Sequence, residues 1–197
     1  MKRFDSYSRT NVYEDSARLP PGGYVIGIIE VSEKSESWGD VLELKFDIAE
    51  GEHRGFYTEQ YNGSRHEGKR YRGVYRMRVP KEDGSERDGW TIKRFNTDML
   101  AIEESNPGFE WDWDERKLTG RLVGALFHER EYDIDGRKGT YTALHSLRAA
   151  GKVRSGDFTL PEPRLLGSGG ETQGPEPQGY SPPDYAEADL GDGDLPF

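Results

Sequence analysis

The chain has 197 residues, of which 32% are hydrophobic and 32% charged, and its formal net charge at pH 7 is −10. It contains no cysteine, which excludes disulfides and thiolate zinc sites and is typical of a reducing compartment. No apolar run suits a membrane span or a signal peptide, so we expect a cytoplasmic protein with no membrane partner. The length fits one domain of about 160 residues around a single core, followed by a tail.

The first two predicted strands form a hairpin. Gly23 to Ser32 is apolar on both faces, as in a central strand, and Leu42 to Ile48 alternates apolar with charged residues. Ser35 to Gly39 supplies the turn between them. Further strands are predicted at residues 55–61, 70–79, 120–132 and 140–147, with Asp135-Gly136 turning between the last two.

One helix is predicted between the strands. It runs from about Ile92 to Glu104, with Thr91 as its N-cap and Asn106-Pro107-Gly108 as its stop. This order of elements predicts a mainly β fold, a five-stranded OB-fold-like barrel with one helix, an extra hairpin and a disordered C-terminal tail. Barrel edges and the loops at 64–69 and 81–89 could pair with another chain or lie free, which leaves a homo-oligomer open.

A basic and aromatic segment precedes the helix. From Arg54 to Arg94 there are eleven Lys and Arg residues against six carboxylates. Single-stranded nucleic acid needs this mixture, because cations follow the phosphates and aromatic faces stack on bases at roughly 1 to 3 kcal/mol each. The candidate nucleic-acid-binding residues are Trp38, Tyr57, Tyr61, Lys69, Arg70, Tyr71, Arg72, Tyr75, Arg76, Arg78, Trp90, Lys93 and Arg94.

Alternation within this segment leaves a second interpretation open. Its four arginines from Arg70 to Arg78 fall on one face of an extended strand, whereas Tyr71 and Tyr75 fall on the other. These tyrosines therefore either stack on bases or face the core, leaving only the arginines solvated.

The acidic charge is concentrated at the C-terminus. Residues 171–197 hold seven carboxylates and no Lys or Arg, so the tail carries −7 of the net charge of −10. We expect an N-terminal arm over residues 1–18, a single-stranded-DNA-binding domain over 19–163, a flexible linker over 164–186 and an acidic docking tip over 187–197. The residues expected to dock a partner are Asp192, Asp194, Leu195, Pro196 and Phe197.

The tip suits a pocket with a cation at its rim. Phe197 can enter an apolar pocket while its α-carboxylate meets a Lys or Arg, and Pro196 fixes one backbone torsion beforehand. This ending resembles the C-terminal tip of bacterial and phage single-stranded-DNA-binding proteins. The alternative is an acidic solubilising tail that happens to end in Phe.

The body also carries a resemblance, over roughly Leu19 to Pro161. It rests on Leu19-Pro-Pro-Gly-Gly-Tyr-Val, Lys93-Arg-Phe, Ala101-Ile-Glu-Glu-Ser-Asn-Pro-Gly, Trp111-Asp-Trp-Asp and Leu118-Thr-Gly-Arg-Leu-Val-Gly. These stretches are similar to a family of small uncharacterised phage proteins. The resemblance implies a DNA-binding accessory of replication or recombination, located in the bacterial host cell if a phage encodes it.

The leading hypothesis is a non-catalytic protein that coats single-stranded DNA and recruits replication, recombination or repair enzymes through its tip. The alternative is an acidic interaction module, a DNA mimic or inhibitor of a host nucleic-acid enzyme, which the net charge of −10 favours. A metal-dependent nuclease built on Asp112 and Asp114 ranks last, because the loop from Glu110 to Glu115 lacks EF-hand spacing, and we expect its tryptophans to pin it to the barrel. No cofactor, metal or catalytic residue is expected.

Overall fold

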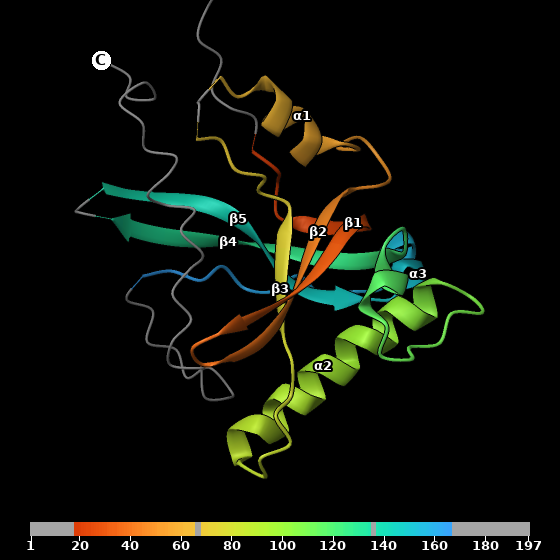
Figure 1. Ribbon diagram of the computed structural model, residues 1–197. Coiled ribbons are helices and arrows are strands. Elements are labelled where there is room, and N and C mark those ends of the chain that lie inside the picture. The colour runs from red at the N-terminus through yellow and green to blue at the C-terminus, as the bar shows by residue number, and fades with distance from the viewer. Residues whose placement is uncertain (1–17, 66–67, 135–136, 167–197) are drawn as a thin grey trace, which may run out of the picture.

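The computed structural model describes residues 18–65, 68–134 and 137–166. Within them lies a five-stranded antiparallel sheet in the order β3-β2-β1-β4-β5, with helices packed around it (Figure 1). In chain order the elements are β1 (Gly22–Glu36), β2 (Gly39–Ile48), α1 (Phe56–Gly63), β3 (Val74–Arg78), α2 (Glu86–Ser105), the 3₁₀ helix η1 (Glu115–Leu118), β4 (Leu122–Ile134), β5 (Arg137–Arg148) and α3 (Ala150–Ser155).

Both predicted hairpins are present. β1 pairs with β2 down to Glu36 and Gly39, so Ser37 and Trp38 form the turn. β4 pairs with β5 up to Ile134 and Arg137; the turn predicted at 135–136 lies outside the described residues. Alternation along the chain was enough to predict these strands because each hairpin partner is close in sequence.

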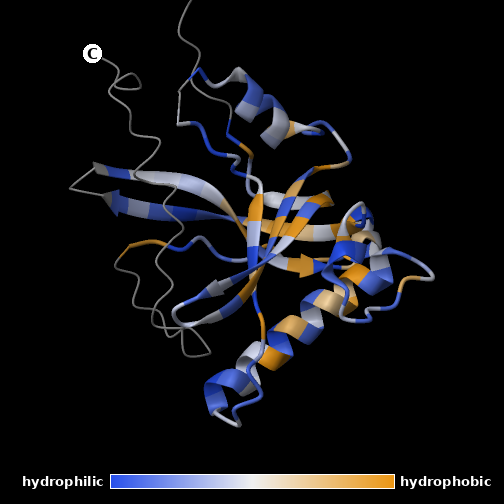
Figure 2. Ribbon diagram, in the orientation of Figure 1, coloured by the Kyte–Doolittle hydropathy of each residue, from blue (hydrophilic) through white to orange (hydrophobic). Residues whose placement is uncertain are grey.

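One face of the sheet packs against α2. Its core includes Ile28 of β1, Phe46 of β2 and Phe127 of β4, with Phe95 and Ile102 from the helix. Figure 2 shows that the beginning of α2 is hydrophilic and that its apolar residues follow further along the helix. We call the opposite face of the sheet the outer face. Because side chains alternate along a strand, Glu43, Lys45, Arg76 and Arg78 belong to the outer face.

The outer face is partly covered at β1 and β4. Phe158, just after α3, lies against Gly23 of β1, where an added Cβ would come within 2.5 Å of its ring. His128 of β4 shares a hydrogen bond of 3.0 Å between its Nδ1 and the carbonyl of Glu162. Arg164, the first residue of the predicted linker, donates its N–H to Glu129 and accepts from the N–H of Glu131. The outer face of β2 and β3 carries no helix in the described part of the chain.

The strand predicted at 55–61 is wrong, because Phe56–Gly63 forms the helix α1. The carboxylate of Asp47, at the end of β2, accepts hydrogen bonds from the N–H groups of Tyr57 at 2.9 Å and Thr58 at 3.0 Å. These donors of the first helical turn have no partner within the helix. A residue ten positions upstream therefore stabilises the helical conformation, and the predicted extra hairpin is absent from the described residues.

Two predicted boundaries also differ. The strand predicted at 70–79 is shortened to β3, Val74–Arg78. The helix predicted from Ile92 begins instead at Glu86, with Ser85 as N-cap, whose Oγ accepts from the N–H of Asp88 at 3.1 Å. Thr91, the predicted N-cap, lies inside α2 and donates its hydroxyl to the carbonyl of Arg87. The predicted stop is confirmed, since α2 ends at Ser105 and Asn106 caps it.

The mainly β fold and the five strands are confirmed, but a closed barrel is not. β3 and β5 are the two edges of the sheet, and no strand pairing joins them among the described residues. The described residues therefore form an open antiparallel sheet with three α-helices, and the predicted OB-fold barrel is not confirmed.

Candidate nucleic-acid interface

The outer face of β2 and β3 carries an ion-pair network around Glu43. Glu43 lies opposite Arg76 in the register of the two strands, and its side chain is only 8% exposed. Its Oε1 lies 2.6 Å from Lys34 Nζ and its Oε2 lies 3.1 Å from Arg76 Nε. Burial alone would raise the pKa of Glu43, but the two cations outweigh it and lower the pKa below its ordinary value. One carboxylate thus holds two cations in place.

A second ion pair continues the network toward the start of β3. Lys45 Nζ lies 2.8 Å from the carboxylate of Glu30, and this bond raises the pKa of Lys45. The hydroxyl of Tyr61 in α1 adds to that rise, so Tyr61 lies within electrostatic reach of Lys45. The last turn of α1 is therefore adjacent to the outer face.

The connection from α1 to β3 brings together two tyrosines and a lysine. The rings of Tyr61 and Tyr71 meet edge to face with centroids 5.9 Å apart, and Lys69 Nζ lies 4.7 Å from the centre of the Tyr61 ring. Tyr71 donates its hydroxyl to the carbonyl of Phe46 at 3.0 Å, and burial raises its pKa to about 12. Tyr71 is thereby anchored to the sheet, while the Tyr61 ring is less constrained.

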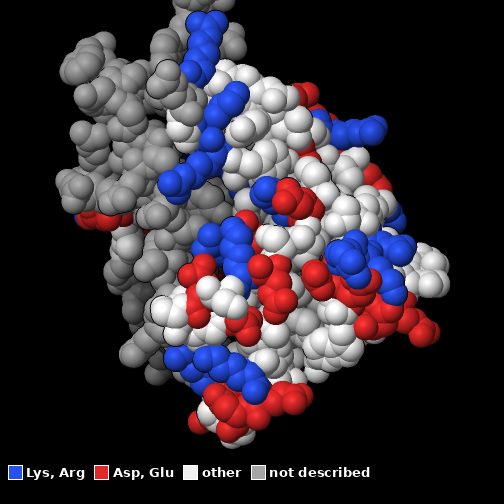
Figure 3. Space-filling model, in the orientation of Figure 1, with Lys and Arg blue, Asp and Glu red and all other residues white. Residues whose placement is uncertain are grey.

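A third aromatic residue lies at the other end of β3. Trp38, in the β1–β2 turn, has the guanidinium of Arg78 4.3 Å from its ring centre. Tyr61 and Trp38 therefore flank β3, whose five residues span roughly 17 Å at about 3.4 Å per residue. Figure 3 shows Lys and Arg side chains in a file over the connection from α1 to β3, with acidic side chains beside them further down.

The remaining arginines of the segment belong to the same connection. Arg70 is exposed and Arg72 is half-buried, both just before β3. From Lys69 to Arg78 the chain has five Lys and Arg residues and no carboxylate. The structure thus brings together eight of the thirteen sequence-predicted residues along β3 and its two ends: Trp38, Tyr61, Lys69, Arg70, Tyr71, Arg72, Arg76 and Arg78.

Three predicted residues lie elsewhere, on the core side of the sheet. Tyr57 is 7% exposed and packs edge to face on Phe46. The hydroxyl of Tyr75 donates to Asp98 of α2 at 2.7 Å and accepts from Arg94 at 2.9 Å. Arg94 also donates to Asp98 at 3.1 Å. The side chains of Tyr75, Arg94 and Asp98 thus hold β3 and α2 together, which agrees with the core-facing interpretation of Tyr75.

The last two predicted residues form a separate pair on α2. Trp90 is 47% exposed, and Lys93 Nζ lies 5.0 Å from the centre of its ring. Because α2 packs on the core side of the sheet, this pair is not part of the outer face.

Sequence analysis missed Lys34, Lys45 and an aromatic pair on the β4–β5 hairpin. Tyr132 and Tyr141 have ring centroids 6.3 Å apart. Tyr132 shares the parity of His128 along β4, so it belongs to the outer face. Alternation of side chains across the predicted hairpin was the signal that could have found this pair.

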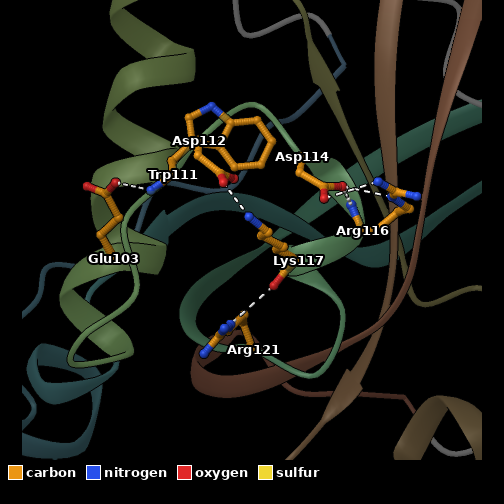
Figure 4. Close-up of polar contacts among 7 residues, drawn as sticks. All are labelled: Glu103, Trp111, Asp112, Asp114, Arg116, Lys117 and Arg121. Carbon is orange, nitrogen blue, oxygen red and sulfur yellow. Dashed lines mark hydrogen bonds and ion pairs between the residues drawn. The ribbon is translucent and has the colours of Figure 1, made fainter.

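The loop from Glu110 to Glu115, the candidate metal site of the sequence, has its two aspartates paired with cations that follow it in the chain (Figure 4). Asp112 forms an ion pair with Lys117, and Asp114 forms one with Arg116 at 2.8 Å, with Asp114 also capping η1. Each cation lowers the pKa of the carboxylate it contacts. The described residues contain no group of three His, Asp or Glu side chains placed to hold a metal ion.

The geometry defines a mainly β protein whose open sheet presents cations and aromatic rings along the edge strand β3. Comparison with known proteins adds no relative: no protein-family model matches the chain, and no curated protein is significantly similar to it. None of the helices in the described ranges is long and apolar enough to cross a membrane.

Proposed function

We propose that this protein binds single-stranded DNA with little sequence preference and recruits replication, recombination or repair proteins through its acidic C-terminal tip. The observation that carries the proposal is the arrangement along β3, where cations lie between Tyr61 at one end and Trp38 at the other. Cations can neutralise phosphates, and exposed ring faces can stack on bases of any identity.

The order of the elements supports the same function. In an OB-fold, a partly open five-stranded barrel, the face of strands 2 and 3 and the loops beside it bind oligonucleotides. Here β1 to β3 precede α2, and β4 and β5 follow it, in the sheet order β3-β2-β1-β4-β5. We interpret this sheet as an OB-fold left open between β3 and β5. The cations and rings described above then occupy its nucleic-acid-binding face.

A titration of labelled oligo-dT followed by fluorescence anisotropy, at two salt concentrations and with duplex DNA as competitor, tests this proposal. The double variant Lys69→Gln, Arg70→Gln is expected to weaken binding and to reduce the steepness of the log-log salt dependence by about 1.4, at about 0.7 per phosphate contact. The matched control is Arg116→Gln, Lys117→Gln, whose cations are paired with Asp114 and Asp112 away from β3. Equal losses in the two double variants would refute the assignment to β3.

Recruitment rests on the tail, which lies outside the described residues. A linker of this length holds the tail near the body at an effective concentration on the order of millimolar, so its carboxylates compete with DNA for the cations. Deleting residues 171–197 is therefore expected to tighten oligo-dT binding at low salt. Deleting only Pro196 and Phe197 is expected to spare DNA binding and abolish capture of the partner enzyme; unchanged capture would exclude the docking role.

An acidic interaction module is the competing function, and the net charge of −10 favours it. It would not bind single-stranded DNA even without the tail. The same titration separates the two functions, because binding that weakens with salt and resists duplex competitor supports the first, and no binding by either chain length supports the second.

A further inference from the structure

A hollow lined by aromatic rings and carboxylates lies on the core side of the sheet, away from the outer face. Its rings are Phe95 of α2 with Trp111 and Trp113 from the loop that follows, and its carboxylates are Glu33 of β1 and Glu115 of η1. Val79 and a leucine of β2 complete the lining. None of these residues belongs to the proposed DNA-binding face.

Of these rings, that of Trp113 is open to solvent, whereas Trp111 is half-buried and Phe95 belongs to the core. Trp113 is 73% exposed, and it stacks on Phe95 with an angle of 12° between the rings and centroids 6.0 Å apart. The ring centroids of Trp111 and Trp113 are 6.0 Å apart, and their ring planes meet at 53°. The backbone of Trp113 has φ +68, a left-handed conformation that a bulky residue adopts only against a steric cost. An exposed indole kept in a costly conformation is typical of a binding surface.

The two carboxylates differ from the others in the same loop. Asp112 and Asp114 are each paired with a cation, but the side-chain carboxylates of Glu33 and Glu115 have no hydrogen bond or ion pair to another described residue. Arg116 is close enough to Glu115 for the carboxylate to raise its pKa, yet its guanidinium is bonded to Asp114. The hollow thus combines the exposed ring of Trp113 and the half-buried ring of Trp111, with Phe95 stacked beneath Trp113, and two side-chain carboxylates that have no ion-pair partner among the described residues.

We propose that this hollow binds the guanidinium group of an arginine presented by a basic segment of a partner protein. Ring faces attract a cation, and a guanidinium is flat, weakly hydrated and able to stack on a ring while it donates hydrogen bonds to a carboxylate. A lysine ammonium would bind more weakly, because its hydration shell is held more tightly. Phosphates would be repelled by Glu33 and Glu115, so nucleic acid is not the occupant. The proposal is independent of DNA binding.

The test uses the full chain and the NMR signals of the indole N–H groups, because the protein has four tryptophans and only two line the hollow. Titration with N-acetyl-arginine-N-methylamide is expected to shift the signals of Trp111 and Trp113 and to leave those of Trp38 and Trp90 in place. The lysine analogue should shift the same signals less, and the neutral citrulline analogue should not shift them. Equal effects of the arginine and citrulline analogues, or equal shifts of all four signals, would overturn the proposal.

Substitutions of the two carboxylates test their contribution to binding of the arginine analogue. Glu33→Gln combined with Glu115→Gln is expected to weaken binding of the arginine analogue by about tenfold, since each partly exposed charge contributes modestly. Glu36→Gln, on the same strand but outside the hollow, is the matched control and should bind as the unmodified protein does. Unchanged binding in the double variant, with unaltered Trp38 and Trp90 signals to show a folded chain, would refute the role of the carboxylates.

Two other possible occupants of the hollow, a second copy of the chain and the chain's own N-terminus, can be distinguished by the Trp113 signal with no ligand added. If Trp113 signals shift with protein concentration, a second copy of this chain fills the hollow. If they shift in the full-length variant Lys2→Gln, Arg3→Gln, the chain's own basic N-terminus fills it. Either result would overturn the proposed partner segment, and the absence of both, together with binding of the arginine analogue, would support it.

Discussion

Replacing Tyr75 by Phe is expected to lower the free energy of unfolding by about 2 kcal/mol and to leave the affinity for oligo-dT unchanged. The Tyr75 hydroxyl donates to Asp98 at 2.7 Å and accepts from Arg94 at 2.9 Å. Asp98 is fully buried, with 0% exposure. Burial raises the pKa of Tyr75, so the hydroxyl is neutral at physiological pH and remains a donor to the carboxylate.

The size of the expected loss in unfolding free energy depends on the hydrogen bonds that Asp98 retains in the variant. A hydrogen bond to a charged group contributes roughly 1.5 to 3 kcal/mol, and leaving a buried carboxylate without any donor would cost more. In the variant, the carboxylate of Asp98 still accepts a hydrogen bond from Arg94 Nε at 3.1 Å. The expected loss therefore lies in the lower half of that range.

Urea unfolding of the full chain, followed by tryptophan fluorescence, measures this loss. With a denaturant slope of about 2 kcal/mol/M, the midpoint should fall by about 1 M. The matched control is Tyr24→Phe, which removes a hydroxyl that donates to the carbonyl of Pro20 at an exposed site and should change stability by less than about 0.5 kcal/mol. If both variants lost the same stability, or if Tyr75→Phe bound oligo-dT more weakly than the unmodified protein, the core assignment of Tyr75 would be refuted.

Three further predictions concern charged and titrating groups. Because the pKa of Glu43 is lowered in the native protein, its ion pairs stabilise the fold above the ordinary pKa of 4.5 and cease to do so as pH falls through the lower native value. Glu43→Gln should flatten this pH dependence of the free energy of unfolding in urea titrations. The same variant should tighten oligo-dT binding at low salt, because it releases Lys34 and Arg76. Asp47→Ala should cost about 1 kcal/mol in the same assay, because it removes the acceptor for the first turn of α1; a change near zero would contradict that capping role. Burial lowers the pKa of His128, so the unfolded chain takes up the proton first and the free energy of unfolding should fall as pH drops below about 6.5. In thermal unfolding, His128→Gln should remove this part of the dependence of stability on pH. An unaltered pH dependence would show that other groups cause it.

The hairpins were predictable because the information that determines them is local. In β2, Leu42, Leu44 and Phe46 alternate with charged residues, and the pairing partner lies directly across a short turn. The end of α2 was predictable for the same reason, since Asn106 and Pro107 follow it at once.

Elements that depend on distant residues were not predictable. The segment starting at Phe56 has aromatic residues suited to a strand, but the carboxylate of Asp47 turns it into α1. Alternation separated Tyr75 from Arg76, yet it could not say which face would meet a helix. That became clear only from Asp98, which α2 places against the Tyr75 hydroxyl. The hollow beside Trp113 joins the β1–β2 hairpin, the end of β3, α2 and the loop after α2, which are far apart in sequence, so no local pattern indicated it.

The open edge of the sheet has a consequence for solubility. An edge strand offers unpaired backbone groups to any strand of similar shape, which makes it a template for aggregation. β3 is short, with five residues, and carries Arg76 and Arg78 on its outer face. Two copies pairing through this edge would set like charges side by side, which is unfavourable. Charge repulsion between the arginines of β3 therefore disfavours edge-to-edge pairing of the sheets of two copies of the chain.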